Sequence, residues 1–226
     1  MKIIHFDEID STNAYLIREQ SELEDMTFVE TDFQTQGKGR VDRTWVSNKN
    51  ENVMFSILIK DKELMANYAG LSVVTALLVR NYLSSYVVEG VTVKWPNDVY
   101  INGKKVCGIL LQGQLPNFLV IGIGINVNQK EFNGEYRRTP TSLSLETKRN
   151  IDLKTFKKGL YIYLDEHLDL FKRGLYNPVN DIRRYNYLKG RDTNMGTVLD
   201  INDDYSLKVE NLDGEIVNIS SGEIKL

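Results

Sequence analysis

The stretch from residue 93 to residue 114, VKWPNDVYINGKKVCGILLQGQ, constrains the fold more strongly than any other part of the chain. It contains Asn102 and Gly103, the dipeptide of a tight two-residue turn, between two apolar runs. Both runs are too short for a helix, so they are predicted to form neighbouring antiparallel strands. Gly108 interrupts the second strand, where another group can approach the backbone closely. Lys105 stands at the start of that strand and is therefore a positive charge on a rigid support.

The composition limits both the number of domains and the class of function. The 226 residues, of which 42% are hydrophobic, can bury one substantial core and a small second unit. A net charge of −3 is unlike the basic excess of general nucleic-acid binders. Cys107 is the single cysteine, which excludes an intrachain disulfide and favours a reducing compartment. The sequence has neither a signal-peptide pattern nor an apolar run of bilayer length, so we expect a cytoplasmic protein with no membrane partner.

The hydrophobic pattern predicts an α+β protein whose composition changes near its end. The expected strands beside the hairpin are 3–6, 27–32, 52–59 and 118–127, and the expected helices are 64–86 and 153–174, with a loop region over 128–150. From Tyr187 onward, glycine and aspartate separate the short strands 197–201, 206–210 and 215–219, which suits a small β-barrel. We therefore expect two domains, 1–186 and 187–226.

Several polar residues have a structural interpretation as well as a functional one. Ser11 or Thr12 is placed to cap a helix that begins near Ala14, and capping alone is the commoner role for these hydroxyls. The sequence Thr141-Ser142-Leu143 is a similar candidate cap before a short turn. His167 lies on the apolar face of helix 153–174 without a second histidine nearby, so we expect a packed or partly exposed side chain rather than a metal ligand.

The second informative stretch, residues 33–45, reads FQTQGKGRVDRTW. Gly37 and Gly39 flank Lys38, and Arg40 and Arg43 follow closely, so backbone amides and cations can converge on an anion. The Walker spacing is absent, and no helix-opening GxGxxG is present. On this stretch alone, a solvated mobile loop is an equal alternative to an anion-binding loop.

A third glycine pair, Gly122 and Gly124, lies within the apolar run 118–127. A dinucleotide-binding loop would open a helix after such glycines, whereas here the strand residues continue through both. A β-bulge or the close approach of another group is the better explanation. Asn126 then lies at the end of the strand, beside whatever group approaches.

Five segments, taken in this order, resemble the motifs of the biotin protein ligases. They are residues 10–13 (DSTN), 34–40 (QTQGKGR) with Arg43 and Trp45, 94–98 (KWPND), Lys105-x-x-Gly108 and Gly122-x-Gly124-Ile125-Asn126. The resemblance extends from Phe6 to Ile224, and the KWPND and GKGR elements are its specific parts. It implies a mixed β-sheet catalytic domain with helices on one side, followed by a small SH3-like barrel.

The resemblance also implies a reaction and a set of residues for it. In that family, ATP activates the biotin carboxylate to biotinyl-5′-adenylate with loss of pyrophosphate, and the biotinyl group then passes to one lysine of a biotin carboxyl carrier domain. The implied catalytic residues are Lys105 and Arg40. The implied biotin-binding residues are Ser11, Thr12, Asn13, Gln34, Gly37, Lys38, Gly39, Arg40, Lys105 and Gly108. The implied adenylate-binding residues are Arg40, Arg43, Trp45, Asn97, Lys105 and Asn126, with Trp45 as a lid on the adenine end. Asp98 either helps to hold the Mg²⁺ that accompanies ATP or only fixes the loop after Pro96.

Two residues depart from the family pattern. Lys38 replaces the first arginine of the loop, which keeps the charge but loses the planar guanidinium. Asp42 stands where a glycine is usual, which adds a negative charge and narrows the backbone freedom. We expect residues 37–44 to be mobile without ligand, because a lid that closes on a labile adenylate protects it from water.

Alternative functions stay open on the sequence. A lipoate or octanoate ligase or transferase shares the expected fold, and Asp42 also allows a non-catalytic biotin or adenylate sensor. No helix-turn-helix precedes Phe6, so we expect no DNA-binding repressor role. The strand edge at residues 110–114 either pairs with a second subunit, giving a homodimer, or is shielded by loops.

Overall fold

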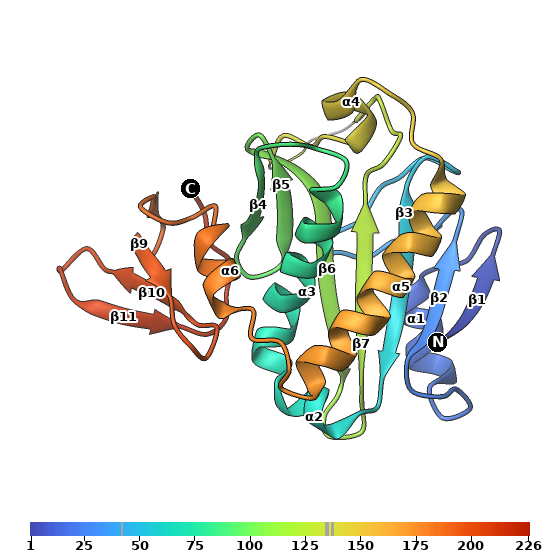
Figure 1. Ribbon diagram of the computed structural model, residues 1–226, viewed down its shortest axis with the longest axis horizontal. Coiled ribbons are helices and arrows are strands. Elements are labelled where there is room, and N and C mark those ends of the chain that lie inside the picture. Colours follow the sequence, from blue (N-terminus) through green and yellow to red (C-terminus); the bar gives the residue numbers. More distant parts are fainter. Residues whose placement is uncertain (42, 134–135, 137) are drawn as a thin grey trace.

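A computed structural model describes the chain apart from residues 42, 134, 135 and 137 (Figure 1). Its main sheet has the strand order β1-β2-β3-β7-β6-β5-β4. The strands are β1 (Lys2–Phe6), β2 (Thr27–Thr31), β3 (Val53–Ile59), β4 (Val91–Lys94), β5 (Asp98–Ile101), β6 (Lys104–Gln114) and β7 (Phe118–Ile125). Strands β1 and β2 are parallel and the other neighbours are antiparallel, so the expected mixed sheet is confirmed.

The hairpin expected around Asn102 and Gly103 is confirmed. It joins β5 to β6, and both turn residues have positive φ, 51° and 76°, as a type I′ turn requires. A second turn at residues 95–97 joins β4 to β5. The KWPND sequence therefore forms the end of one strand, a turn and the start of the next.

Strand β7 shows how the two faces of the sheet are used. Leu119 and Ile121 belong to the large core cluster, whereas Phe118 and Val120 belong to a smaller cluster with Leu16. Successive strand residues point to opposite faces, so these clusters lie on opposite sides of the sheet.

The helices divide between these two faces. Helices α3 (Tyr68–Leu83) and α5 (Leu153–Lys172) supply the large cluster and lie across one face in Figure 1, whereas α1 (Thr12–Glu19) supplies Leu16 to the other. The expectation of helices on one side is therefore wrong for α1. A helical apolar pattern shows that a helix has a buried face, but it does not show which side of the sheet it covers.

The helix expected over 64–86 is two helices, α2 (Lys62–Ala66) and α3, which meet at Asn67. The Asn67 side chain donates to the Glu63 carbonyl oxygen, and its backbone N–H donates within the last turn of α2. Such local hydrogen bonds compete with the continuation of a helix. The periodic pattern spans the break because the apolar residues on both sides pack into the same core.

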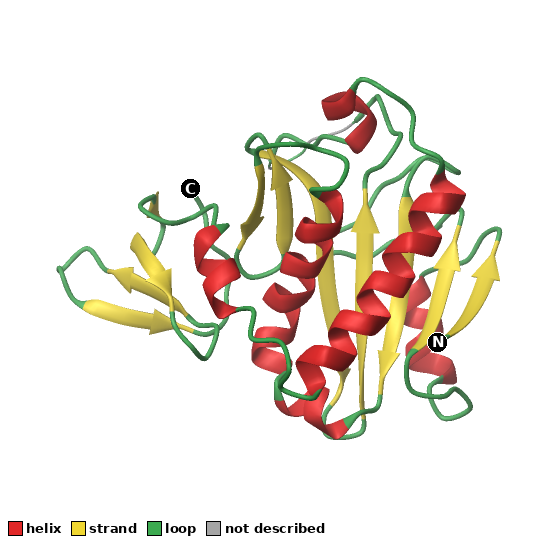
Figure 2. Ribbon diagram, viewed as in Figure 1, coloured by secondary structure: helices red, strands yellow, loops and turns green. Residues whose placement is uncertain are grey.

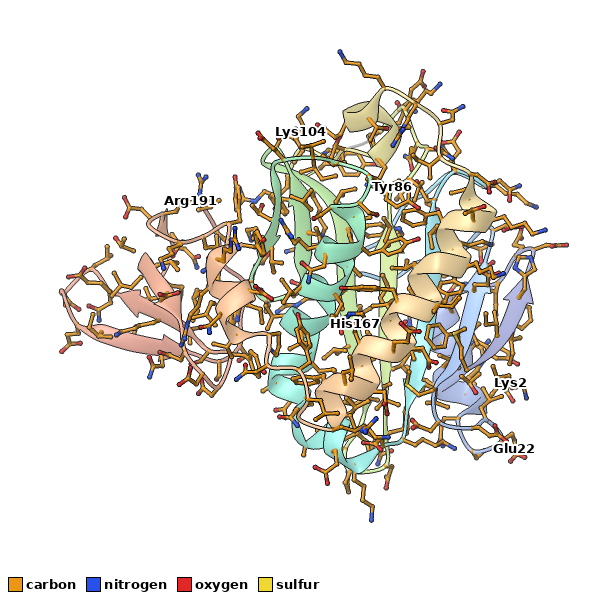
Figure 3. The ribbon with its side chains drawn as sticks, viewed as in Figure 1. Lys2, Glu22, Tyr86, Lys104, His167 and Arg191 are labelled. Atoms are coloured by element: carbon orange, nitrogen blue, oxygen red, sulfur yellow. The ribbon has the colours of Figure 1, made fainter. Side chains whose placement is uncertain are left out.

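Two of the remaining helices begin at capping side chains. Helix α4 (Leu143–Thr147) begins after Ser142, whose hydroxyl accepts from the Leu145 N–H, and α5 begins after Asp152. The short helix α6 (Val179–Arg184) was not expected. His167, labelled on α5 in Figure 3, stacks on Tyr163 with ring centroids 3.9 Å apart and contacts the Tyr163 carbonyl oxygen, so it is a packed side chain as expected.

The C-terminal residues form a separate sheet beyond α6, seen as the yellow arrows at the left of Figure 2. Its strands are β8 (Asp192–Thr193), β9 (Gly196–Ile201), β10 (Leu207–Glu210) and β11 (Ile216–Ile219). The three strands expected here are confirmed. Where a small barrel was expected, the structure shows an antiparallel sheet of order β11-β10-β9-β8. No helix in the described part of the chain is long and apolar enough to cross a membrane.

Candidate active site

A cavity of about 590 Å³ opens on the sheet face that carries α1. This volume is within the range of small-molecule sites. Of the site residues expected from the sequence, the cavity is lined by Ser11, Thr12, Asn13, Gln34, Lys38, Gly39, Arg40, Arg43, Trp45, Asn97, Asp98, Lys105, Gly108 and Asn126. Gly37 is buried just behind it, and Asp42 lies outside the described residues. Segments distant in sequence thus meet at one cavity.

The floor of the cavity consists of glycines on β6 and β7. Gly108 lies directly opposite Gly124, and a Cβ atom at Gly124 would lie 2.5 Å from the Trp45 ring. A Cβ atom at Gly122 would overlap the Asn13 side chain. The predicted close approach to these glycines is confirmed, and the approaching groups are the side chains of Trp45 and Asn13.

A β-bulge determines the direction of Lys105. Val99 pairs with Cys107 and Tyr100 pairs with Lys105, so Val106 is an extra residue in β6. In a regular strand, Lys105 and Gly108 would point to opposite faces, because they are three residues apart. The bulge brings them to one face: a Cβ atom at Gly108 would lie 3.2 Å from Lys105 Nζ.

Across the strand pair, Asp98 lies opposite Gly108 and binds Lys105, with 2.7 Å between Lys105 Nζ and Asp98 Oδ1. The Asp98 side chain is 14% exposed, so this ion pair is partly shielded from water. The Lys105 backbone is also held, because its N–H donates to the Thr139 carbonyl oxygen. The lysine is therefore fixed at both its backbone and its ammonium group.

The stretch that begins with Gly37 and ends with Trp45, here called the Gly-rich loop, lies above this floor, and its two ends pair with each other. Lys38 and Thr44 form an antiparallel bridge, and the Trp45 N–H donates to the Gly37 carbonyl oxygen. Gly37 must be glycine here, since a Cβ atom would lie 2.5 Å from the Trp45 carbonyl oxygen. The Trp45 ring centroid lies 5.8 Å from Lys105 Nζ, so the loop brings an aromatic face beside the central cation.

A buried polar network lies at the other end of the cavity, where α1 begins. Ser11 is the N-cap of α1, and the Thr12 N–H donates to Gln34 Oε1 at 2.8 Å. Thr12 Oγ1 lies 2.7 Å from Ser56 Oγ, and Ser56 donates to Asn13 Oδ1. This end therefore offers several hydrogen-bonding groups within a few ångströms of one another.

Ser56 and Gln112 belong to this network and were missed in the sequence. Asn13 Nδ2 donates to Gln112 Oε1 at 2.9 Å, and Ser56 is fully buried. The available signal was a polar residue inside an otherwise apolar strand, in NVMFSILI and in ILLQGQ. A buried polar side chain needs a partner, so such interruptions deserve a search for one.

The two expected asparagines are anchored differently. Asn97 Oδ1 accepts from Arg40 Nη1 at 2.9 Å, and Asn97 Nδ2 donates to the Ile109 carbonyl oxygen. Asn126 follows the end of β7, as expected, and its Nδ2 donates to the Thr141 carbonyl oxygen. Both amides are thus held by the protein at the cavity wall.

Lys94 is a further cation at the cavity that was not predicted from the sequence as a site residue. It is 7% exposed, and burial lowers its pKa from the ordinary value of 10.5 to about 8. Its Nζ donates to the Ile224 carbonyl oxygen at 3.0 Å. The end of the chain therefore reaches the cavity, which a lysine within a strand sequence gives no reason to expect.

Asp98 is the expected protein ligand for Mg²⁺. In nucleotide sites this ion is commonly held by one or two carboxylates together with phosphates and water. Asp98 offers one carboxylate at the cavity, although its Oδ1 is already bound to Lys105. The residues present therefore fit an ion held mainly by its nucleotide, with Asp98 as the protein contribution.

The fold and the site together define a class of protein. The model of the biotin/lipoate A/B protein ligase family matches residues 5–128, more than half of the chain, and the chain belongs to this family. Among solved structures it resembles the biotin protein ligase of Aquifex aeolicus, with a TM-score of 0.83, 27% identity, and coverage of 100% of this chain and 97% of that one. A structure of that ligase in complex with biotin and ATP gives a TM-score of 0.82, 29% identity, and coverage of 99% and 97%.

Curated relatives include the bifunctional ligase/repressor BirA of Bacillus subtilis, 30% identical over 88% of this chain and 66% of that protein. BirA of Escherichia coli is 31% identical over 73% of this chain and 53% of that protein. The chain thus spans just under two thirds, or less, of the length of these relatives.

Proposed function

We propose that the protein is a biotin protein ligase, which converts biotin and ATP to biotinyl-5′-adenylate and pyrophosphate and transfers the biotinyl group to a carrier lysine. The observation that carries this proposal is the position of Lys105 in the cavity. One end of the cavity holds the buried network of Thr12 and Gln34, and the other holds Trp45 and Asn97. Such a cavity suits a polar ring, a carboxylate and a nucleotide bound in series.

The first step requires a carboxylate to attack the α-phosphate of ATP, and both groups are negative. Fixed cations reduce this repulsion and stabilise the charge that develops in the transition state. We assign this role to Lys105, held by Asp98, and to Arg40, held by Asn97. Because these contacts position both cations before the reaction, little reorganisation is needed.

The network at α1 favours biotin over lipoate or octanoate. The ureido ring of biotin has a carbonyl that accepts hydrogen bonds and amides that donate them. Thr12, Asn13, Gln34 and Ser56 carry groups of both kinds. An apolar acyl chain beside them would leave buried polar groups without partners, which costs free energy. Ser11 completes the proposed ring site.

We place the adenylate against Trp45, Asn97 and Asn126, with Arg40 and Arg43 near its phosphate. The aromatic face of Trp45 can stack on adenine, and the asparagine amides can bind base or ribose. Mg²⁺ would enter with ATP and neutralise phosphate charge, with Asp98 as its protein contact. Lys38 and Gly39 complete the loop that covers the ligand.

The proposed acceptor is the biotin carboxyl carrier domain of a biotin-dependent carboxylase. A curated relative from Paracoccus denitrificans, 34% identical over 53% of this chain, is named biotin--[acetyl-CoA-carboxylase] ligase.

A homodimer is also part of the proposal. Strand β5 pairs with β6 only through Gly108, so among the described strands residues 110–114 have β7 as their neighbour and an open opposite edge.

The test is pyrophosphate release from ATP with biotin, with lipoate or with neither. We expect release in the reaction with biotin and not in the other two, as a burst of about one equivalent per site that is followed by a slow steady phase when no carrier is present. Release with lipoate but not biotin would identify the lipoate branch of the family. Binding of biotin and ATP without release would identify a sensor.

A further inference from the structure

Two arginines of the Gly-rich loop bind the end of the chain. Arg40 Nη2 donates to the Gly222 carbonyl oxygen at 2.9 Å. Arg43 Nη2 lies 2.5 Å from Glu223 Oε1. The two segments are about 180 residues apart in sequence, yet both line the candidate active-site cavity. The loop is therefore joined to the C-terminal segment 222–224 at two positions.

The C-terminal segment is itself attached to the main domain below the cavity. Lys94 Nζ donates to the Ile224 carbonyl oxygen, and the Ile224 side chain is 2% exposed within the core. Lys225 N–H donates to Asn194 Oδ1, and the Asn194 N–H donates back to the Lys225 carbonyl oxygen. The two residues that follow Glu223 are thus held by a buried contact at Ile224 and by paired hydrogen bonds at Lys225.

The C-terminal sheet that leads into this segment is also fixed. Trp95 Nε1 donates to the Tyr205 carbonyl oxygen at 2.9 Å. The Tyr205 ring lies so close to Gly70 of α3 that a Cβ atom there would overlap it. Lys94 and Trp95 of KWPND therefore hold the C-terminal residues, while Asn97 and Asp98 of the same motif face the cavity.

The Arg43–Glu223 pair is partly exposed, with side chains 48% and 31% exposed. Exposed ion pairs contribute little to the stability of a fold. The pair joins a loop to a rigid segment, however, so it can fix the position of the loop without stabilising the domain. The consequence is a loop that is joined, beside the cavity, to a carboxylate of the C-terminal segment.

We propose that Glu223 is a positioning residue, which binds Arg43 and thereby keeps the Gly-rich loop closed over the acyl-adenylate. The proposal rests on the proposed ligase function. Biotinyl-5′-adenylate is a mixed anhydride: attack by the carrier lysine forms the amide and releases AMP, whereas attack by water forms biotin and AMP. A loop held by Glu223 excludes water until the carrier lysine arrives.

The test compares the wild type with Glu223→Gln and with Glu210→Gln. Glu210 is an exposed glutamate on β10 of the same small sheet, so its substitution removes the same charge away from the cavity. The readout is the steady-state release of pyrophosphate from biotin and ATP without carrier, because each hydrolysed adenylate permits another turnover. A second readout is pyrophosphate released per biotin transferred when carrier is present. Thermal unfolding of each variant checks that the fold is retained.

Glu223→Gln is expected to raise carrier-independent pyrophosphate release by about fivefold, the upper range for one exposed ion pair. Pyrophosphate released per biotin transferred should rise with it, while Glu210→Gln matches the wild type. Unchanged values in a folded Glu223→Gln protein would overturn the positioning role. A wild type that releases no pyrophosphate with biotin and ATP would instead overturn the proposed function.

Discussion

Lys105 Nζ lies 2.7 Å from Asp98 Oδ1, and the two side chains reach the same face because β6 carries a bulge between Lys105 and Cys107. The ion pair fixes a cation at the middle of the cavity without occupying its whole hydrogen-bonding capacity, since an ammonium group has three donors. The remaining donors are free to bind a carboxylate and a phosphate. This arrangement supports the proposed role of Lys105 in adenylate formation.

That role is tested by comparing the replacement of Lys105 with the replacement of its neighbour Lys104. Lys105→Ala is expected to reduce biotin-dependent pyrophosphate release by about 100-fold or more, because it removes a fixed charge from the transition state. Lys104→Ala is the matched control, since Lys104 is exposed and binds Glu146 at 3.4 Å. Single-turnover rates measure both. Equal activity of Lys105→Ala and Lys104→Ala would contradict the assignment.

Two glycine substitutions test which ligand binds at each end of the cavity. Gly124→Ala is expected to displace the Trp45 ring and to raise KM for ATP on the order of tenfold, whereas Gly122→Ala displaces Asn13 and raises KM for biotin. Each variant serves as the control for the other, and both KM values are measured for each. If both substitutions raised the same KM, the proposed order of the two ligands along the cavity would be wrong.

The lowered pKa of Lys94 predicts that the stability of the protein depends on pH. Burial lowers its pKa to about 8, so between pH 8 and 10.5 the unfolded chain binds more protons than the folded one. The free energy of unfolding attributable to this residue therefore rises with pH across that window. Urea denaturation at several pH values should show this rise in the wild type but not in Lys94→Met. Lys104→Met serves as the exposed control, and an identical pH dependence in all three proteins would contradict the buried charge.

Ligand-dependent protection of residues 37–44 stays a prediction from the sequence. Trypsin should cut after Lys38, Arg40 or Arg43 more slowly when biotin and ATP are both present, because a closed loop cannot enter the protease. Cleavage after Lys148 and Arg149, on an exposed turn after α4, provides the internal control. Equal cleavage of the loop with and without the ligands would argue against closure.

Local signals in the sequence were sufficient for much of the fold. Asn102 and Gly103 predicted the β5–β6 hairpin, and the sequence Thr141-Ser142-Leu143 predicted a cap where α4 begins, because turn and cap geometry depends on adjacent residues. The boundary expected near residue 186 stays a prediction. The position of α1 on the opposite sheet face was not predictable, because its apolar pattern only shows that one side is buried.

The candidate site was predicted less completely than the fold. Motif residues such as Gln34 and Lys105 do line one cavity. Ser56 and Gln112 were missed because their partners come from α1, and Glu223 because its partner Arg43 lies at the other end of the chain. Contacts of this kind depend on tertiary packing, which a single sequence does not display. Asp42, the most unusual residue of the loop, lies outside the described residues.

The most direct test of the ligase function is transfer of labelled biotin to a purified biotin carboxyl carrier domain, with and without ATP. The proposed function predicts ATP-dependent label on one carrier lysine, no label on a carrier whose lysine is replaced by arginine, and loss of labelling in Lys105→Ala. Binding of biotin and ATP by the wild type without label on any carrier lysine would contradict it.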